Sequence, residues 1–363
     1  MSTTPLKRNT ALDLIRAVAI LLVIWQHASE FYYIGPNLTV LHAPCPSLAV
    51  INSLSRSCVP LFVMLSGYLL LPIKTDTPTF FRRRFVRILA PWLFWCVAYA
   101  VYYVFYNGDS LAACLTHIAS IPVNWGVQVG HLWYIYMLIG IYLLMPILSP
   151  WLRSCSKREL QGYLLLWGVT TLLPYLHDAG ISVLGECTWN PSPLLHYYSG
   201  FVGYLLLGHY LRRYGVPGVW PSALLLIAGY AVTALAFTHW SYRTDSAVEL
   251  EIPWDFCCTN VVAMTVAVFA LLSRVKLSAT GAVGRAITSV SVYSFAMYLA
   301  HIMVLNTAHT LVSALPVCTD PAVGGPTVWV AVPLTALATF AVTYALVRLL
   351  NILPASRYWL GVD

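Results

Sequence analysis

Charged residues are scarce in this sequence. Asp, Glu, Lys and Arg make up only 9% of its 363 residues, whereas hydrophobic residues make up 59%. A soluble globular domain contains about 25% charged residues, so the composition excludes an ordinary soluble protein and indicates a polytopic membrane protein.

The sequence also lacks a long linker, a low-complexity tract and a metal-binding pattern. It has no CxxC motif and no Cys/His spacing typical of a zinc site. We therefore expect a single membrane domain over residues 1–363, with no metal and no permanently bound cofactor. Most of the nine cysteines are expected to be small packing residues. A disulfide is the alternative for the four that are expected in outward connections, where disulfides persist, namely Cys45, Cys114, Cys187 and Cys318.

Long hydrophobic runs, in contrast, are abundant. A run that crosses a bilayer needs about 20 residues, and ten such runs lie at roughly 11–33, 50–72, 88–106, 131–150, 160–177, 194–212, 219–238, 254–273, 288–312 and 327–350. The sequence therefore predicts an all-α integral membrane protein, a bundle of about ten transmembrane helices. The connection after the third run contains Leu111 to Ile121, which we expect to form a brief interfacial helix.

Basic residues are distributed unevenly among the connections. The two tails and the even-numbered connections hold 17 of the 20 Lys and Arg residues. Because short cytoplasmic loops are rich in Lys and Arg, both termini are predicted to be cytoplasmic. This asymmetry accounts for the net charge of +7, so the charge does not indicate a nucleic-acid partner.

The first hydrophobic run carries ionisable residues that a structural role does not require. Arg16 and His27 are eleven positions apart, so in a helix they share one face at a separation of about 16 Å. Asp13 and Glu30 continue this face. Ionisable side chains within a membrane span are costly and usually functional. We therefore expect Arg16 and His27 to be catalytic, Glu30 to orient His27, and Asp13 to contact substrate.

Four arginines precede the third run: Arg82, Arg83, Arg84 and Arg87. Such a cluster can simply fix the orientation in the membrane. Guanidinium groups also match the geometry of phosphate, and Arg84 and Arg87, three positions apart, project to the same side of a helix. The cluster is a candidate site for a polyphosphate ligand, with anionic lipid as the alternative.

The second run contains features that a plain membrane helix lacks. Pro60 is expected to interrupt its regular hydrogen bonding, and Ser66-Gly67 to permit close helix approach. For Ser66 we favour packing at the substrate-binding surface over nucleophilic attack, because no acid or base lies at helical spacing from it. Arg56 is expected at a depth similar to that of His27.

Two further blocks place histidines at that depth. His131 and Tyr134 begin the fourth run, where an interfacial role is the alternative, and His301 falls in the outer half of the ninth. The convergence of His27, Arg56, His131 and His301 raises the expectation of a substrate-binding site.

Together these groups predict two half-sites joined through the bundle. An anionic cosubstrate binds near Arg16 and the arginine cluster, and a hydroxyl-bearing acceptor binds near His27. Acyl transfer from coenzyme A fits, because its phosphates can stay at the arginines while the pantetheine arm reaches inward. Histidine, with an unperturbed pKa of about 6.5, is a suitable general base.

The motifs resemble those of acyltransferase family 3, the membrane O-acyltransferases of bacterial envelope glycans. Within the family the chain is similar to the standalone type, such as the enzyme that O-acetylates enterobacterial common antigen. The matching blocks, in order, are Arg16-x10-His27, Ser55-Arg56…Pro60-Leu61-Phe62…Ser66-Gly67-Tyr68, Arg84-x-x-Arg87 leading to Pro91, His131-Leu132-Trp133-Tyr134 and Tyr298…His301.

The resemblance implies acetyl-CoA, or another acyl-CoA, as donor and an envelope or lipid-linked saccharide as acceptor. It further implies a bacterial cytoplasmic (inner) membrane location, essential roles for Arg16 and His27, and a donor role for Arg84 and Arg87. Many relatives carry a fused extracytoplasmic SGNH hydrolase-like domain, which we do not expect here. Either the bundle transfers the acyl group directly or a separate extracytoplasmic transferase takes it.

Two other functions stay open. A transporter or flippase of a glycan or lipid intermediate would use Arg16 and His27 as a relay, but no hydropathy symmetry between the chain halves favours it. A structural partner in an envelope-synthesis complex would leave the charged face of the first run unexplained.

Overall fold

The computed structural model describes residues 8–123, 127–187, 189, 194–318 and 326–362. The cytoplasmic position predicted for Lys7 therefore falls outside the described residues. Within them, every regular element is helical, which confirms the predicted all-α class. The order is α1 (Thr10–Glu30), η1 (Pro36–Leu38), α2 (Cys45–Asn52), η2 (Ser53–Ser57), α3 (Cys58–Leu70), α4 (Thr77–Tyr106), α5 (Leu111–Ser120), η3 (Val127–Leu132), α6 (Trp133–Ser154), α7 (Lys157–Thr170), α8 (Leu173–Asp178), η4 (His196–Tyr198), α9 (Val202–Tyr214), α10 (Val219–Trp240), α11 (Ala247–Leu250), η5 (Ile252–Trp254), α12 (Thr259–Leu272), α13 (Ala282–Ser313), η6 (Pro316–Cys318), α14 (Pro326–Leu350) and α15 (Ser356–Trp359).

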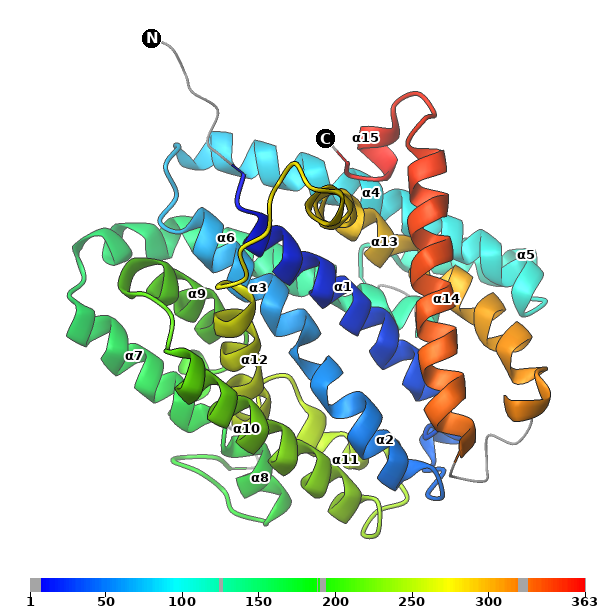
Figure 1. The fold of residues 1–363 in the computed structure, drawn as a ribbon, viewed down its shortest axis with the longest axis horizontal. Coiled ribbons are helices and arrows are strands. Elements are labelled where there is room, and N and C mark those ends of the chain that lie inside the picture. Colours follow the sequence, from blue (N-terminus) through cyan, green and yellow to red (C-terminus); the bar gives the residue numbers. More distant parts are fainter. Residues whose placement is uncertain (1–7, 124–126, 188, 190–193, 319–325, 363) are drawn as a thin grey trace.

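Helix α1 lies at the centre of the bundle (Figure 1). It begins after Asn9, whose side chain accepts a hydrogen bond from the Ala11 N–H and so satisfies one free donor of the first turn. Helices α3, α13 and α14 pack around it. Because α1 is central, its ionisable residues face other helices rather than lipid.

The second hydrophobic run is interrupted, though not where the sequence predicts. The break is the 3₁₀ turn η2, which contains Arg56, and α3 restarts at Cys58. Pro60 lies in the first turn of α3, where its missing N–H costs no helical hydrogen bond. The helix is therefore interrupted at η2, around Arg56, and not at Pro60 as the sequence predicts.

Helices α3 and α9 touch through glycine, as Ser66-Gly67 predicts. A Cβ on Gly67 would lie 1.8 Å from the Leu205 carbonyl oxygen of α9, and one on Gly208 would lie 2.0 Å from the Met64 oxygen of α3. Two small residues facing each other in this way let the helix backbones meet.

Eight of the ten predicted spans are helical segments long and apolar enough to cross a membrane; these are residues 10–30, 45–70, 77–106, 130–154, 219–240, 252–272, 282–313 and 327–350. The fifth run instead divides into α7 and α8, and the sixth contributes only the 13-residue α9. Pro174 explains the division, since it cannot donate to Thr170 and continue α7. Gly200, at φ 81°, precedes α9.

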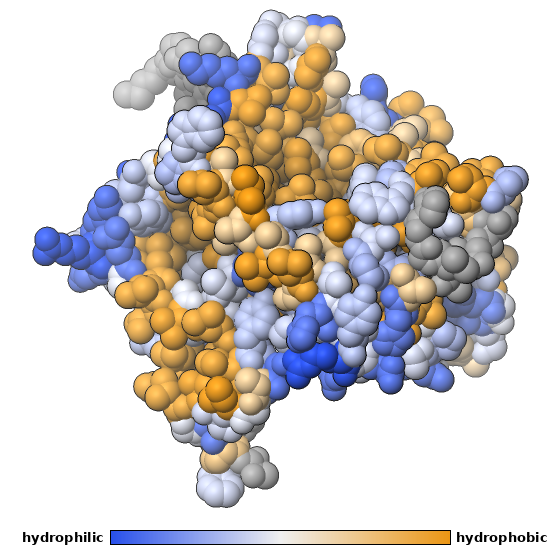
Figure 2. Space-filling view, turned by 60° about the horizontal axis from the view of Figure 1, so that its bottom comes forward, coloured by the Kyte–Doolittle hydropathy of each residue, from blue (hydrophilic) through white to orange (hydrophobic). Residues whose placement is uncertain are grey.

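The surface fits a membrane protein. Figure 2 shows hydrophobic residues over much of the visible face, interrupted by hydrophilic patches. Helix α5 forms where the brief helix was predicted, and its Leu111 and Leu115 are exposed. All nine cysteines are free thiols in the structure, so the four that were expected in outward connections form no disulfide there.

Candidate active site

Three histidines from distant parts of the chain meet inside the bundle. His27 lies on α1, His131 in η3 and His301 on α13. The ring centroids of His131 and His301 are 5.1 Å apart, those of His27 and His301 5.3 Å, and those of His27 and His131 6.4 Å. The predicted convergence of these side chains is confirmed, and we refer to the three rings as the imidazole cluster.

His27 is the member of the imidazole cluster that is set up to accept a proton. Its Nδ1 lies 2.8 Å from Oε2 of Glu30, one turn further along α1. Because a carboxylate accepts, Nδ1 carries the hydrogen and Nε2 keeps its lone pair. The ring also lines a cavity of about 650 Å³. Glu30 thus has the contact predicted for a residue that orients His27.

His131 and His301 lie deeper than His27. The His301 Nδ1 is 2.6 Å from the Tyr298 carbonyl oxygen, and the Tyr298 hydroxyl donates to the carbonyl of His131. The Nε2 atoms of both rings are buried without a hydrogen-bond partner among the described residues. Buried polar atoms are normally paired, so such exceptions are typical of functional sites.

The histidine cavity, as we name the space beside His27, mixes acids, one cation and aromatic rings. Arg56 is 2% exposed; its Nη2 lies 3.2 Å from the Tyr33 hydroxyl and 3.8 Å from Glu251, and its guanidinium lies 4.1 Å from the Trp254 ring centre. Carboxylates and imidazoles accept hydrogen bonds from hydroxyl groups, and aromatic faces pack against C–H groups. The lining includes Gln26, His27, Glu30, Arg56, His131, Trp133, Glu251, Trp254, Asp255 and Phe256.

A second cavity, of about 380 Å³, has the opposite character. Among the residues that the structure describes, four arginines and no carboxylate line it, and we name it the arginine cavity. Arg84 and Arg87 enter from α4, Arg16 from α1 and Arg8 from the residues before α1. Four guanidinium groups around one space create a site for a ligand with several negative charges.

Asp13 holds two of these arginines in place. It accepts hydrogen bonds from Arg8 at 2.6 and 3.0 Å, lies 3.5 Å from Arg16, and accepts from the Ser291 hydroxyl at 2.6 Å. Ser291 in turn accepts from Arg16 at 2.8 Å. The Asp13 hydrogen bond raises the pKa of Arg8. Asp13 is 4% exposed and absent from the cavity lining, so it lies behind Arg16 rather than at the predicted substrate surface.

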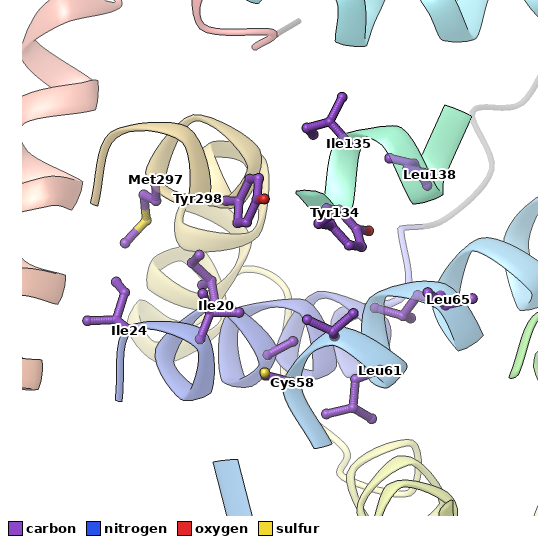
Figure 3. Packing of buried hydrophobic residues seen from close by; sticks show 14 of the residues in the cluster. Ile20, Ile24, Cys58, Leu61, Leu65, Tyr134, Ile135, Leu138, Met297 and Tyr298 are labelled. Atoms are coloured by element: carbon purple, nitrogen blue, oxygen red, sulfur yellow. The ribbon is translucent and has the colours of Figure 1, made fainter. Parts of the chain in front are cut away.

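Two tyrosines that line the arginine cavity lie close to the imidazole cluster. Tyr134 of α6 and Tyr298 of α13 lie side by side (Figure 3), with ring centroids 5.3 Å apart, and both line the arginine cavity. The Tyr298 ring centre is also 5.8 Å from that of His131. On α1, Val23 lines the arginine cavity and His27, one turn later, lines the histidine cavity. The cavities therefore adjoin across one helical turn and two aromatic rings.

The remaining predicted residues divide into two groups. Ser66 lines the arginine cavity, with its hydroxyl bonded to the Phe62 carbonyl oxygen at 3.0 Å. Arg82 and Arg83 are exposed and line neither cavity. Sequence reasoning missed Arg8, Ser291 and Glu251 as site residues. For Arg8 the sequence offered one signal, Asp13 five positions later. For Ser291 and Glu251 it offered none.

The described residues contain no group of three or more His, Cys, Asp or Glu side chains that could hold a metal ion. What they contain is a helical, multi-pass membrane protein with an imidazole cluster next to an arginine-lined cavity. The profile of the family Acyl_transf_3, described as an acyltransferase domain, matches residues 9–348. The chain therefore belongs to this acyltransferase family. No curated protein and no solved structure matches it.

Proposed function

We propose that the protein is a membrane O-acyltransferase that moves an acetyl or other short acyl group from cytoplasmic acyl-CoA to a hydroxyl of an envelope or lipid-linked saccharide. The observation that supports this most is the pairing of the arginine cavity with the imidazole cluster across Tyr134 and Tyr298. In this proposal the protein is of the standalone type, similar to the O-acetyltransferase of enterobacterial common antigen, in a bacterial inner membrane.

The donor binds in the arginine cavity. Arg84 and Arg87, with Arg8 and Arg16, contact the phosphates of the acyl-CoA, since guanidinium groups bind phosphate with charge-assisted hydrogen bonds. The pantetheine arm then follows the apolar part of the lining, which includes Val23, Val59 and Phe62, toward the tyrosines.

The acceptor binds in the histidine cavity. Its hydroxyl donates to Nε2 of His27, and the oxygen attacks the thioester carbonyl carbon as His27 takes the proton. The C–S bond then breaks, and the proton passes from His27 to the departing thiolate to give CoA–SH. Glu30 stabilises the imidazolium that forms, since its carboxylate already contacts Nδ1 at 2.8 Å.

Binding and turnover by detergent-purified protein separate the two half-sites. Acetyl-CoA binding and thioester cleavage are measured for the unmodified protein, for His27→Ala and for Arg84→Ala/Arg87→Ala. The proposal expects His27→Ala to bind donor without turnover and the arginine variant to lose binding. A folded protein that neither binds nor cleaves any of several acyl-CoA donors would contradict it and favour a transporter.

A further inference from the structure

A third group of cations surrounds a separate cleft at the end of α3. Lys74, Arg153, Arg212 and Arg213 line this space of about 630 Å³, together with His209 and the apolar residues Leu71, Pro72, Ile73 and Leu152. We call it the basic cleft. None of its lining residues is acidic, and none of its four cations forms an ion pair within the described part of the chain.

We infer that the basic cleft binds the phosphate of an anionic phospholipid headgroup in the same leaflet as the basic loops. This site is distinct from the arginine cavity, with which it shares no lining residue. The inference does not depend on the acyl-transfer proposal.

The arginines of the basic cleft are held in fixed positions by backbone carbonyls. Arg153 Nη2 donates to the Ile73 oxygen at 2.5 Å, Arg212 Nη1 to the Tyr68 oxygen at 2.9 Å, and Arg213 Nη1 to the Leu152 oxygen at 3.1 Å. A guanidinium has five N–H donors, so each arginine keeps further donors for a ligand. A cluster that only fixed membrane orientation would not need its side chains anchored around one cleft.

The nearest acid in the sequence does not neutralise the basic cleft. Asp76 follows Lys74 by two positions, but its Oδ2 accepts from the Thr79 N–H at 2.9 Å and caps α4. This hydrogen bond lowers the pKa of the Asp76 carboxyl. The carboxylate is thus directed at the helix.

A buried histidine adds a second, independent observation. His209 is 4% exposed and lines the basic cleft, with Nδ1 at 3.2 Å from the Leu71 carbonyl oxygen. Because that oxygen only accepts, Nδ1 carries the hydrogen. Its Nε2 is buried with no partner among the described residues. As a lone-pair acceptor, Nε2 suits a hydroxyl of the headgroup, such as those of a glycerol headgroup, whereas the phosphate itself would contact the cations.

The apolar part of the lining favours a lipid over a soluble phosphate. Leu71, Ile73 and Leu152 are buried residues of the cleft wall, and they suit the glycerol and first methylene groups that follow a lipid phosphate. Basic pockets between membrane helices bind anionic headgroups in this way. A free polyphosphate such as coenzyme A offers the same phosphate chemistry and is the source that the experiment must distinguish.

The position of the basic cleft links lipid to the donor site. Leu70 lines the arginine cavity, and Leu71, the next residue, lines the cleft. Residues 71–76 join α3, which carries Ser66, to α4, which carries Arg84 and Arg87. A bound headgroup would therefore support the connection between two walls of the arginine cavity.

Native mass spectrometry of the purified full-length protein tests this inference, with phosphatidylglycerol, phosphatidylcholine and coenzyme A as separate probes. The variants are Lys74→Glu and Arg212→Gln/Arg213→Gln. We expect the unmodified protein to retain phosphatidylglycerol over phosphatidylcholine, and each cation removed to weaken this retention roughly fivefold.

Arg158→Glu is the matched control, because Arg158 is an exposed cation in the first turn of α7 and does not line the basic cleft. It should retain phosphatidylglycerol like the unmodified protein. Lys74→Glu removes no side-chain hydrogen bond within the described residues, so it keeps the test valid should the arginine variant unfold. Equal phosphatidylglycerol retention by Lys74→Glu and the control overturns the inference. If the cleft variants lose coenzyme A binding but keep phosphatidylglycerol, the cleft binds a soluble phosphate and the lipid inference is overturned as well.

Discussion

The arginine cavity and the histidine cavity adjoin each other but differ in nearly every physical respect. The first has four guanidinium groups and no lining carboxylate, whereas the second has imidazoles, three carboxylates and a single, fully buried arginine. One suits a polyanion that is held by charge, and the other suits a polyol that is held by many weak hydrogen bonds. In the proposed function, donor binding and proton transfer would therefore take place at different ends of α1.

The sharpest way to break this comparison is His27→Ala. General-base catalysis contributes about 10²–10⁴-fold to a rate, so we expect turnover to fall by that factor. Acetyl-CoA binding should stay within about twofold of normal, because His27 does not line the arginine cavity and general-base catalysis acts on the rate. A discontinuous thioester assay combined with equilibrium binding measures both. Near-normal turnover by a folded variant would remove His27 from the mechanism.

The donor side is tested with Arg84→Ala/Arg87→Ala. A hydrogen bond to a charged group contributes about 1.5–3 kcal/mol, so loss of two guanidinium groups should weaken acetyl-CoA binding by about 100-fold or more. The matched control is Arg82→Ala/Arg83→Ala, which removes two exposed arginines of the same helix. Equal losses in both variants would show that charge near α4, rather than the cavity, determines donor binding.

A smaller effect on chemistry is expected for Glu30→Gln. The amide keeps an oxygen near Nδ1 of His27 but loses the charge that strengthens this hydrogen bond. We expect turnover to fall about tenfold with donor affinity unchanged, as measured by initial rates at saturating acetyl-CoA. An unchanged rate would show that Glu30 does not assist His27, and a loss of donor affinity would show that the two cavities are coupled.

The smallest direct effect on either cavity is expected for Gly67→Ala, which acts on packing. Its new Cβ would lie 1.8 Å from the Leu205 oxygen, so α3 must move away from α9, and overpacking of this kind costs about 1–3 kcal/mol. Thermal unfolding in detergent measures the loss. Gly140→Ala, which meets nothing within 4 Å, is the control and should unfold like the unmodified protein. Similar unfolding of both variants would mean that the α3–α9 contact is dispensable.

The sequence predicts much of the fold because hydrophobic length is a local property. Within the described residues, the eight helical segments long and apolar enough to cross a membrane overlap eight of the predicted runs. The fifth run is not a single helix, because Pro174 has no N–H to donate to the Thr170 carbonyl oxygen and α7 cannot continue through it. Pro174 is present in the sequence, so the division of this run into two helices could have been predicted from it.

The site was predictable where one helix carries it, and where the expected depth in the membrane brings residues of different helices together, as for His131 and His301. The 3.6-residue period places Arg16, His27 and Glu30 on one face of α1 without knowledge of other helices. The contact of Ser291 with Asp13 and Arg16 joins residues about 275 positions apart, and no local pattern encodes such a contact. Asp13 is an example. The sequence shows its charge, but it does not show that Arg8, Arg16 and Ser291 surround the carboxylate and keep it out of the cavity lining.

The buried pair of Tyr134 and Tyr298 has a further consequence for the proposed acyl transfer, which concerns proton leakage. Water-filled spaces that approach one another from opposite ends of a membrane protein form a leak for protons unless a dry layer separates them. Tyr134 and Tyr298 are buried, with ring centroids 5.3 Å apart, and would supply such a layer. In the proposed acyl transfer, this pair of rings would have to let the acyl group pass while it keeps ions out.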